Sequence, residues 1–191
     1  MTKSIILVGV GGQGTITTSS ILAKGLIEEG FDVKMSEIHG MSQRGGTVVT
    51  QIKYGEKVYS PIIGEGEADL IVSFEKIEAA RAISYLKKGG TLVTDDREIF
   101  PMPVLTGAAA YPSDALDRLK EICPNVILVQ AAETAKELGN VKAQNIVLLG
   151  ALVRQLGLTG IDWKSIIRSS VPDRFVDLNL KAFDAGAGIA E

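Results

Sequence analysis

A glycine-rich stretch near the N-terminus, "GVGGQGTI" from Gly9 to Ile16, could form a phosphate-binding loop. The P-loop of nucleoside triphosphatases has the pattern G-x-x-x-x-G-K-[ST], in which the Lys reaches the outer phosphates and the hydroxyl holds magnesium. Here Thr15 occupies the Lys position and Ile16 the hydroxyl position, which excludes a nucleoside triphosphatase. The dinucleotide-binding pattern G-x-G-x-x-G fits better, because the glycines follow an apolar run and precede a helical stretch.

The chemistry of such a loop is general. Glycines let the backbone approach a ligand, and the free N–H groups and partial positive charge of a helix N-terminus favour an anion. The pattern therefore predicts either an anion cradle or a tight strand-to-helix turn that binds nothing. For NAD, an acidic residue near the end of the second strand should hold the ribose, and Glu37 stands 23 residues after Gly14. Glu37 could equally pair with Arg44 or lie in solvent at a strand end.

A second candidate site is "EIHGMSQRGG", residues 37–46, which contains the only histidine of the chain, His39. In open α/β sheets, ligands bind beyond the carboxyl ends of the strands, so this loop and the glycine loop are expected to open onto one crevice. Arg44 offers a planar donor group for phosphate or carboxylate. His39 could contact a ligand or could simply cap a backbone carbonyl. Gly45 and Gly46 are expected to begin a hairpin.

Covalent catalysis finds little support in the residues. The stretch "GMSQR" is not the G-x-S-x-G elbow of a serine hydrolase, and the only cysteine, Cys123, has no neighbouring histidine in the sequence. The acidic pairs Glu28–Glu29, Asp95–Asp96 and Glu65/Glu67 are typical of surface charge. Asn145 lies inside an apolar helical stretch, where it could face a ligand or partner or could tether a loop. No catalytic or metal-ligating residue is predicted.

Composition limits the function classes further. The chain has 191 residues, 46% apolar content and a net charge of −3, which is typical of a soluble globular protein and argues against nucleic-acid binding. One cysteine cannot ligate an iron–sulfur cluster or form an internal disulfide. The N-terminal apolar run, residues 5–8, is too short for a signal peptide or a membrane span, so a cytoplasmic location is expected.

The element pattern predicts an α/β fold, a Rossmann-like and mainly parallel sheet flanked by helices, with an inserted β-hairpin after strand two. The hairpin is expected within "TVVTQIKYGEKVYS", with a turn near Gly55–Glu56 and a second strand from Val58. Strands are predicted at about 4–9, 33–38, 70–74, 91–94 and 126–130.

Four helical stretches carry local signals. The first, at about 15–29, ends at Gly30, and the second runs to Gly89 with Ile77, Ala80, Ile83 and Leu86 along one side. Both helices are expected to cover the sheet with their apolar sides. A third contains Ile146, Leu149, Val153 and Leu156 at helical spacing, with Gly150 allowing close packing. Asp162 is a suitable N-cap for the next segment, and the last helix begins at about Pro172.

Four stretches together resemble the gamma-type domain of 2-oxoacid:ferredoxin oxidoreductases: "GVGGQGTITTSSILAKGL", "EIHGMSQRGGTVVTQIKYG", "NIVLLGAL" and "NLKAFDAG". They span nearly the whole chain, so the resemblance implies one gamma-like domain over residues 1–191. Within this group "HGMSQRGG" is most similar to the small beta subunit of indolepyruvate ferredoxin oxidoreductase. Gamma domains of the pyruvate type more often have Tyr-Gly-Pro-Glu before Arg-Gly-Gly.

The resemblance implies a small subunit that is inactive alone. A large partner subunit would bind thiamine diphosphate with magnesium and carry the iron–sulfur clusters, while this chain would line the path of coenzyme A. The complex would oxidatively decarboxylate a 2-oxoacid, such as indolepyruvate or another arylpyruvate, to an acyl-coenzyme A and pass electrons to ferredoxin. The expected contacts to the bound co-substrate are Gly9, Gly11, Gly12, Gln13 and Gly14 in the first loop and His39, Ser42, Gln43 and Arg44 in the second.

Two alternatives remain open at this point. The chain could be the corresponding subunit of a pyruvate or 2-oxoglutarate ferredoxin oxidoreductase, because the subgroup assignment depends on a few positions. It could also be an NAD(P)-dependent dehydrogenase that uses the glycine loop with Glu37, although the loop and hairpin after strand two disfavour this alternative.

Overall fold

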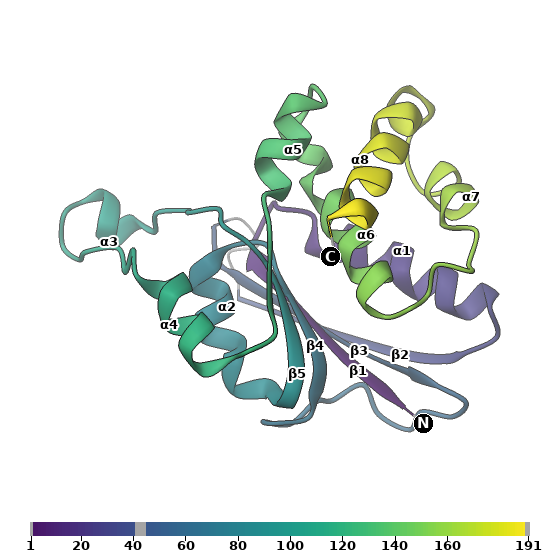
Figure 1. Cartoon of the computed structure of the whole chain (residues 1–191), viewed down its shortest axis with the longest axis horizontal. Helices are drawn as coiled ribbons and strands as arrows, with labels where there is room; N and C mark the ends of the chain where they lie inside the picture. The colour runs from purple at the N-terminus through teal and green to yellow at the C-terminus, as the bar shows by residue number, and fades with distance from the viewer. Residues whose placement is uncertain (1, 41–44, 190–191) are drawn as a thin grey trace.

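The computed structural model describes residues 2–40 and 45–189. Its centre is a six-stranded sheet in the order β2-β3-β1-β4-β5-β6 (Figure 1). The strands are β1 (Lys3–Val10), β2 (Asp32–His39), β3 (Thr47–Gly55), β4 (Ala68–Ser73), β5 (Leu86–Asp95) and β6 (Val126–Val129). The helices are α1 (Thr15–Glu28), α2 (Lys76–Ala82), α3 (Met102–Leu105), α4 (Ala115–Ile122), α5 (Ala131–Glu137), α6 (Gln144–Gln155), α7 (Trp163–Arg168) and α8 (Val176–Gly188), with 3-10 turns η1 (Ile83–Tyr85), η2 (Val141–Ala143) and η3 (Asp173–Phe175). The predicted fold class is confirmed.

Strand β3 lies between β1 and β2 and runs antiparallel to both, whereas β1, β4, β5 and β6 are parallel to one another. The inserted hairpin is therefore formed by β2 and β3. The predicted turn at Gly55–Glu56 with a returning strand from Val58 is wrong, because β3 already has a paired strand on each side. After β3 the chain leaves the sheet, and the Val58 amide donates to the Asp32 carboxylate at 2.9 Å.

Helices α1 and α6 cover one face of the sheet, with α8 packed on α6 and α7 packed on α1 and α8 (Figure 1). The period-2 pattern of β1 follows from this arrangement, since Ile5 and Leu7 join the core on this face while Ile6 and Val8 join the core on the other. The close packing predicted at Gly150 is confirmed: a Cβ there would lie 2.3 Å from the carbonyl oxygen of Phe183 on α8.

Two helix ends follow the sequence signals. Gly30 has φ 90°, and its amide donates to the carbonyl of Ile27, which closes α1 as predicted. The Asp162 side chain accepts a hydrogen bond from the Ser165 amide at 3.1 Å and caps α7.

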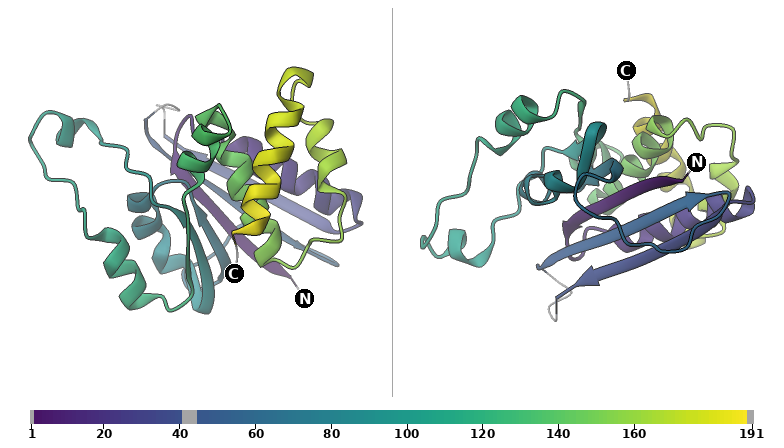
Figure 2. Two further views of the ribbon diagram at one scale, coloured as in Figure 1. Left: turned by 45° about the horizontal axis from the view of Figure 1, so that its top comes forward. Right: turned by 90° about the horizontal axis from the view of Figure 1, so that it is seen from below.

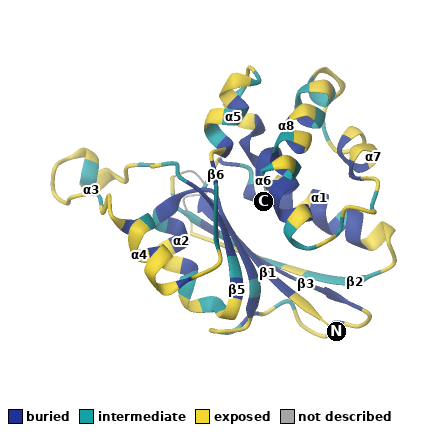
Figure 3. Ribbon diagram, in the orientation of Figure 1, coloured by how far each residue is buried: buried dark blue, intermediate teal, exposed yellow. Residues whose placement is uncertain are grey.

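Helices α2 and α4 cover the other face of the sheet over a smaller core. The predicted helix to Gly89 is wrong, because α2 ends at Ala82 and β5 begins at Leu86, in register with Ala68 of β4. The buried face of α2 is also not the predicted one. Ala79 and Ala82 are buried in the core on this face, whereas Ala80 is exposed. Figure 3 shows α2 and α4 on this side of the largely buried sheet.

Residues 97–112, here called the arm, connect β5 to α4 and project away from the sheet (Figure 2). The arm contains α3 and exposes Phe100, Met102 and Leu105. The Phe100 ring contacts the Tyr111 ring at 4.9 Å between centroids, which joins the two legs of the arm. The arm is thus an ordered projection with apolar side chains in solvent.

Candidate functional site

The glycine loop joins β1 to α1 at the carboxyl edge of the sheet. Gly12 and Gly14 have φ angles of 101° and 90°, in the left-handed region that favours glycine. At position 9 a glycine is required by lack of space, because a Cβ there would lie 2.9 Å from both Gln13 Oε1 and Phe74 Cβ. The loop leads into α1, whose N-cap Gly14 contributes no side-chain hydrogen bond. The first amides of this 14-residue helix can therefore meet an anion.

Gln13 holds the loop in place from inside. Its side chain is buried, with Oε1 accepting from the Val10 amide at 2.7 Å and Nε2 donating to the Phe74 carbonyl at 2.6 Å. The amide therefore ties the end of β1 to the end of β4. Gln13 determines the shape of the loop, and its polar side-chain atoms are occupied within the protein.

The second predicted loop is attached to the first by backbone hydrogen bonds. The Gly11 amide donates to the Gly46 carbonyl at 2.8 Å, and the Gly45 amide donates to the Gly11 carbonyl at 3.3 Å. His39 is exposed at the end of β2, where its Nδ1 lies 3.0 Å from the Gly40 carbonyl oxygen. Ser42, Gln43 and Arg44 lie outside the described residues. Backbone hydrogen bonds between glycines thus join the two loops.

The position of Glu37 does not suit an NAD site. In the register of the sheet, Glu37 lies opposite Thr50 of β3, and Thr50 lies opposite Leu7 of β1. Because neighbouring strands are about 4.8 Å apart, β2 stands nearly 10 Å from β1. A ribose-binding acid in a dinucleotide site belongs to the strand beside β1. That place is taken by β3.

Asn145 lies against the glycine loop at the start of α6. Its side chain is in contact range of Gly14, where a Cβ would be 3.0 Å from Asn145 Cβ and Nδ2. The Thr18 hydroxyl of α1 donates to the Asn145 carbonyl at 3.0 Å. These contacts pack the start of α6 against the glycine loop and α1.

A cavity of about 650 Å³ adjoins Gly45 and Gly46 on the α2 side of the sheet, beneath the arm. Its size is within the range of small-molecule sites. Glu75, just before α2, is fully buried at its wall and caps the helix by accepting from the amides of Ile77 and Glu78 at 2.6 and 2.9 Å. The same carboxylate accepts from the Ile99 amide at 3.2 Å and from the Tyr111 hydroxyl.

Glu75 therefore links α2 to the arm through hydrogen bonds. Burial, followed by the hydrogen bond to Glu75, raises the pKa of Tyr111, so its hydroxyl remains a donor in the accessible pH range.

Two further buried carboxyl groups lie at this edge of the sheet. Burial raises the pKa of Glu78, although the Thr47 hydroxyl donates to it at 3.1 Å and the Arg81 guanidinium lies 3.7 Å away. Asp95, at the end of β5, is completely buried, so the prediction of surface charge is wrong for it. Burial and, to a smaller extent, the neighbouring Asp96 raise the pKa of Asp95 to about 7. A hydrogen bond from the Ala132 amide acts in the opposite direction and lowers this pKa.

Sequence reasoning missed Glu75, Glu78, Asp95 and Tyr111. A signal existed for two of them: Glu75 directly precedes a helix that it caps, and Asp95 directly follows a buried parallel strand. For Glu78 and Tyr111 no local pattern distinguishes them from surface residues, because the partners that they contact, Thr47 and Glu75, are far away in the sequence.

The described part of the chain shows neither a metal-binding cluster nor a membrane-spanning helix. In the ranges 2–40 and 45–189, no group of three or more His, Cys, Asp or Glu is placed to hold a metal ion. Among the residues that the structure describes, no helix is long and apolar enough to cross a bilayer.

Residues 4–189 match the family model described as "Pyruvate ferredoxin/flavodoxin oxidoreductase", and the chain belongs to this family. It is 43% identical to the indolepyruvate oxidoreductase subunit IorB of Pyrococcus horikoshii, with 98% of this chain and 96% of that protein covered. The same subunit from Thermococcus kodakarensis is 41% identical with the same coverage. The solved gamma subunit of a keto/oxoacid ferredoxin oxidoreductase from Geobacter sulfurreducens is 26% identical with a TM-score of 0.71, covering 100% of this chain and 97% of that one. The resemblance inferred from sequence is confirmed.

Proposed function

We propose that the whole chain, residues 1–191, is the small subunit of an indolepyruvate or related arylpyruvate ferredoxin oxidoreductase and is inactive alone. The large partner subunit holds thiamine diphosphate, magnesium and the iron–sulfur clusters. Thiamine diphosphate supplies the carbanion chemistry needed for decarboxylation of a 2-oxoacid. Coenzyme A accepts the acyl group, and the electrons leave through the clusters to ferredoxin. The complex acts in the cytoplasm.

The observation that carries this proposal is the 43% identity to IorB over 98% of the chain. The residues support the division of labour. Cys123 is the only cysteine, so iron–sulfur ligands must come from another chain.

The part that we assign to this chain is binding coenzyme A through its anionic groups. The amides at the start of α1 and the left-handed Gly12 and Gly14 form one side of the site. Gly45, the residue after Arg44 in the sequence, has its backbone bonded to Gly11, and we assign Arg44 to the contacts with an anionic group on this basis. His39, Ser42 and Gln43 would complete the contacts.

Reconstitution tests the proposal directly. The chain is co-expressed with its large subunit, and ferredoxin reduction is measured with indolepyruvate, phenylpyruvate, pyruvate and 2-oxoglutarate. Arylpyruvates should be the best substrates, activity should require coenzyme A, and the isolated chain should oxidise none of them. A preference for pyruvate or 2-oxoglutarate would assign the chain to another enzyme of the family. Turnover by the isolated chain would refute the proposal.

Arg44→Ala tests the assignment to coenzyme A. A charge-assisted hydrogen bond contributes about 1.5–3 kcal/mol, so its loss should raise the KM for coenzyme A by about tenfold or more. The KM for the 2-oxoacid and the association of the subunits should not change. Arg168→Ala, an exposed arginine on α7, is the matched control. An unaltered KM for coenzyme A in Arg44→Ala would exclude this role.

A further inference from the structure

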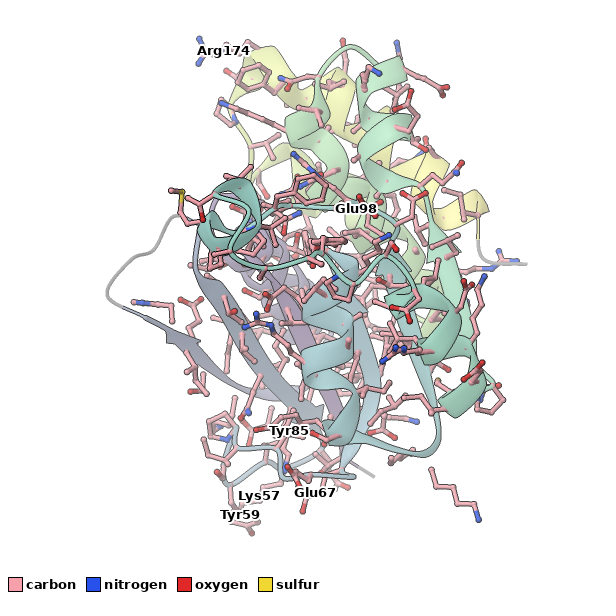
Figure 4. All side chains as sticks on the ribbon, turned by 90° about the vertical axis from the view of Figure 1, so that its left-hand side faces the viewer. Lys57, Tyr59, Glu67, Tyr85, Glu98 and Arg174 are labelled. Atoms are coloured by element: carbon pink, nitrogen blue, oxygen red, sulfur yellow. The ribbon has the colours of Figure 1, made fainter. Side chains whose placement is uncertain are left out.

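Three hollows of about 650, 360 and 670 Å³ adjoin one another along the α2 and α4 side of the molecule. The first two share Ile77, Arg81 and Pro112, and the second and third share Ile83 and Ile122. Figure 4 faces this side, with Glu98 and Tyr85 labelled near opposite ends of α2. We call the three hollows together the docking groove.

Most of the groove's lining is apolar. Its floor includes Ile77 and Ala80, two of the four residues that the sequence pattern predicted as the buried side of this helix. The arm adds Phe100, Met102 and Leu105, which are 46%, 67% and 64% exposed. Ile122, at the end of α4, is 64% exposed. Apolar patches of this extent on a soluble protein mark sites of protein contact.

The exposed charges along the groove are mostly positive. Arg81, Lys87, Lys88 and Arg118 line it and are exposed, whereas Asp114 is the one exposed carboxylate among its lining residues. The carboxylates of Glu75 and Glu78 also line the first hollow, but both are buried. Three of these cations pair with carboxylates of this chain: Arg81 with Glu78, Lys87 with Asp69 and Arg118 with Asp114. These pairs reduce the positive excess, but exposed cations still outnumber exposed carboxylates among the described lining residues. The excess is opposite in sign to the net charge of −3 of the whole chain, so a second copy of this acidic chain is a poor electrostatic match for the groove.

We infer that the docking groove receives a segment of the large partner subunit that presents apolar side chains flanked by Asp or Glu. The inference rests on the proposed function, because it requires that subunit. The apolar residues provide burial, and the exposed cations select the acidic flanks and orient the segment. One end of the groove adjoins Gly45 and Gly46, so the seated segment lies beside the two glycine-rich loops.

The apolar part is tested with a pair of exposed isoleucines. Ile122 lies in the last turn of α4 inside the groove, and Ile27 lies in the last turn of α1 on the opposite layer with 58% exposure. Association with the large subunit is measured by surface plasmon resonance or calorimetry. Ile122→Asp should weaken binding at least tenfold, while Ile27→Asp should bind within twofold of wild type. Equal binding by Ile122→Asp and wild type would overturn the inference.

The electrostatic part is tested within one helix. Arg118→Glu and Lys120→Glu change the net charge equally, but only Arg118 lines the groove. Arg118→Glu should weaken association about tenfold at low salt and less at high salt, and Lys120→Glu should not. Circular dichroism melts of each variant confirm folding. Equal effects of the two substitutions would count against charge-selected docking.

The outcomes separate this inference from the proposed function. If the wild-type chain does not bind the large subunit and the mixture shows no 2-oxoacid oxidation, the proposed function fails. If the wild-type complex is active and both groove variants assemble normally, only the docking inference fails. Sedimentation of the chain alone addresses a second copy: a dimer abolished by Ile122→Asp would assign the groove to self-association and overturn the inference.

Discussion

Replacing Glu75 by Gln should weaken the hydrogen-bonded link between α2 and the arm. One oxygen of the carboxylate accepts two amides at the start of α2, and the other accepts the Ile99 amide and the Tyr111 hydroxyl. A Gln side chain has one acceptor oxygen, and its NH2 group must face donors on the other side. We therefore expect the variant to keep one pair of hydrogen bonds and to lose the other.

The magnitude follows from these contacts. Each lost hydrogen bond to a charged acceptor costs about 1.5–3 kcal/mol, which gives roughly 3–6 kcal/mol for two. Removing a buried charge returns part of this, so we expect a net loss of about 2–4 kcal/mol. For a chain of 191 residues this lowers Tm by roughly 5–15 °C. Tyr111→Phe removes one donor and should cost only about 1–2 kcal/mol.

The assay combines thermal unfolding with amide hydrogen exchange. Exchange should accelerate at Ile99 and in the arm, while β1 and β4 remain protected apart from the global change. Glu98→Gln is the matched control, because this carboxylate pairs with Lys76 near the same helix end but is partly exposed. Its effect should remain below about 1 kcal/mol. If Glu75→Gln were as stable as wild type, or if Tyr111→Phe cost as much, the assigned role would be wrong.

Two further substitutions test the packing and the buried acid. Gly186→Ala would place a Cβ 1.8 Å from the Val147 carbonyl oxygen, so we expect a net loss of about 1–3 kcal/mol in urea unfolding. Gly188→Ala on the same helix meets open space and should be neutral or stabilising. Asp95 has a folded pKa of about 7, above its unfolded value of 3.8, so its stabilising contribution is complete below pH 4 and is lost as the pH rises to 7. Asp95→Asn should therefore gain stability relative to wild type over this interval, by roughly 2–4 kcal/mol at pH 8, and a pH-independent difference would contradict the assignment.

The sequence predicted the parts of the fold that depend on local or periodic signals. Gly30 and Asp162 mark helix ends through the backbone groups that they satisfy, and Gly150 marks a close helix contact. The order of the strands could not be predicted in this way. Whether Val48 pairs with one strand or two depends on where β2 lies in space, and the alternation along β3 is the same in both cases.

The candidate site shows the same limit. The two loops were predicted to meet because carboxyl ends of parallel strands share an edge, and the hydrogen bonds between Gly11 and the pair Gly45–Gly46 agree with that expectation. The apolar stripe of α2 was assigned to the core because periodicity identifies an apolar side without specifying what covers it. Ile77 and Ala80 line the groove instead. Such a residue pattern predicts burial, but the burying surface can belong to another chain.

The inserted strand β3 affects both parts of the proposed function, the coenzyme A site and the docking of the large subunit. By taking the place beside β1, β3 removes the position from which an acid would hold a ribose and brings Gly45 and Gly46 against the glycine loop. The same residues border the docking groove. A partner segment in the groove would thus lie next to the two glycine-rich loops. Under the proposal that these loops bind coenzyme A, the site would be completed only in the complex, as we expect of a subunit that we propose to be inactive alone.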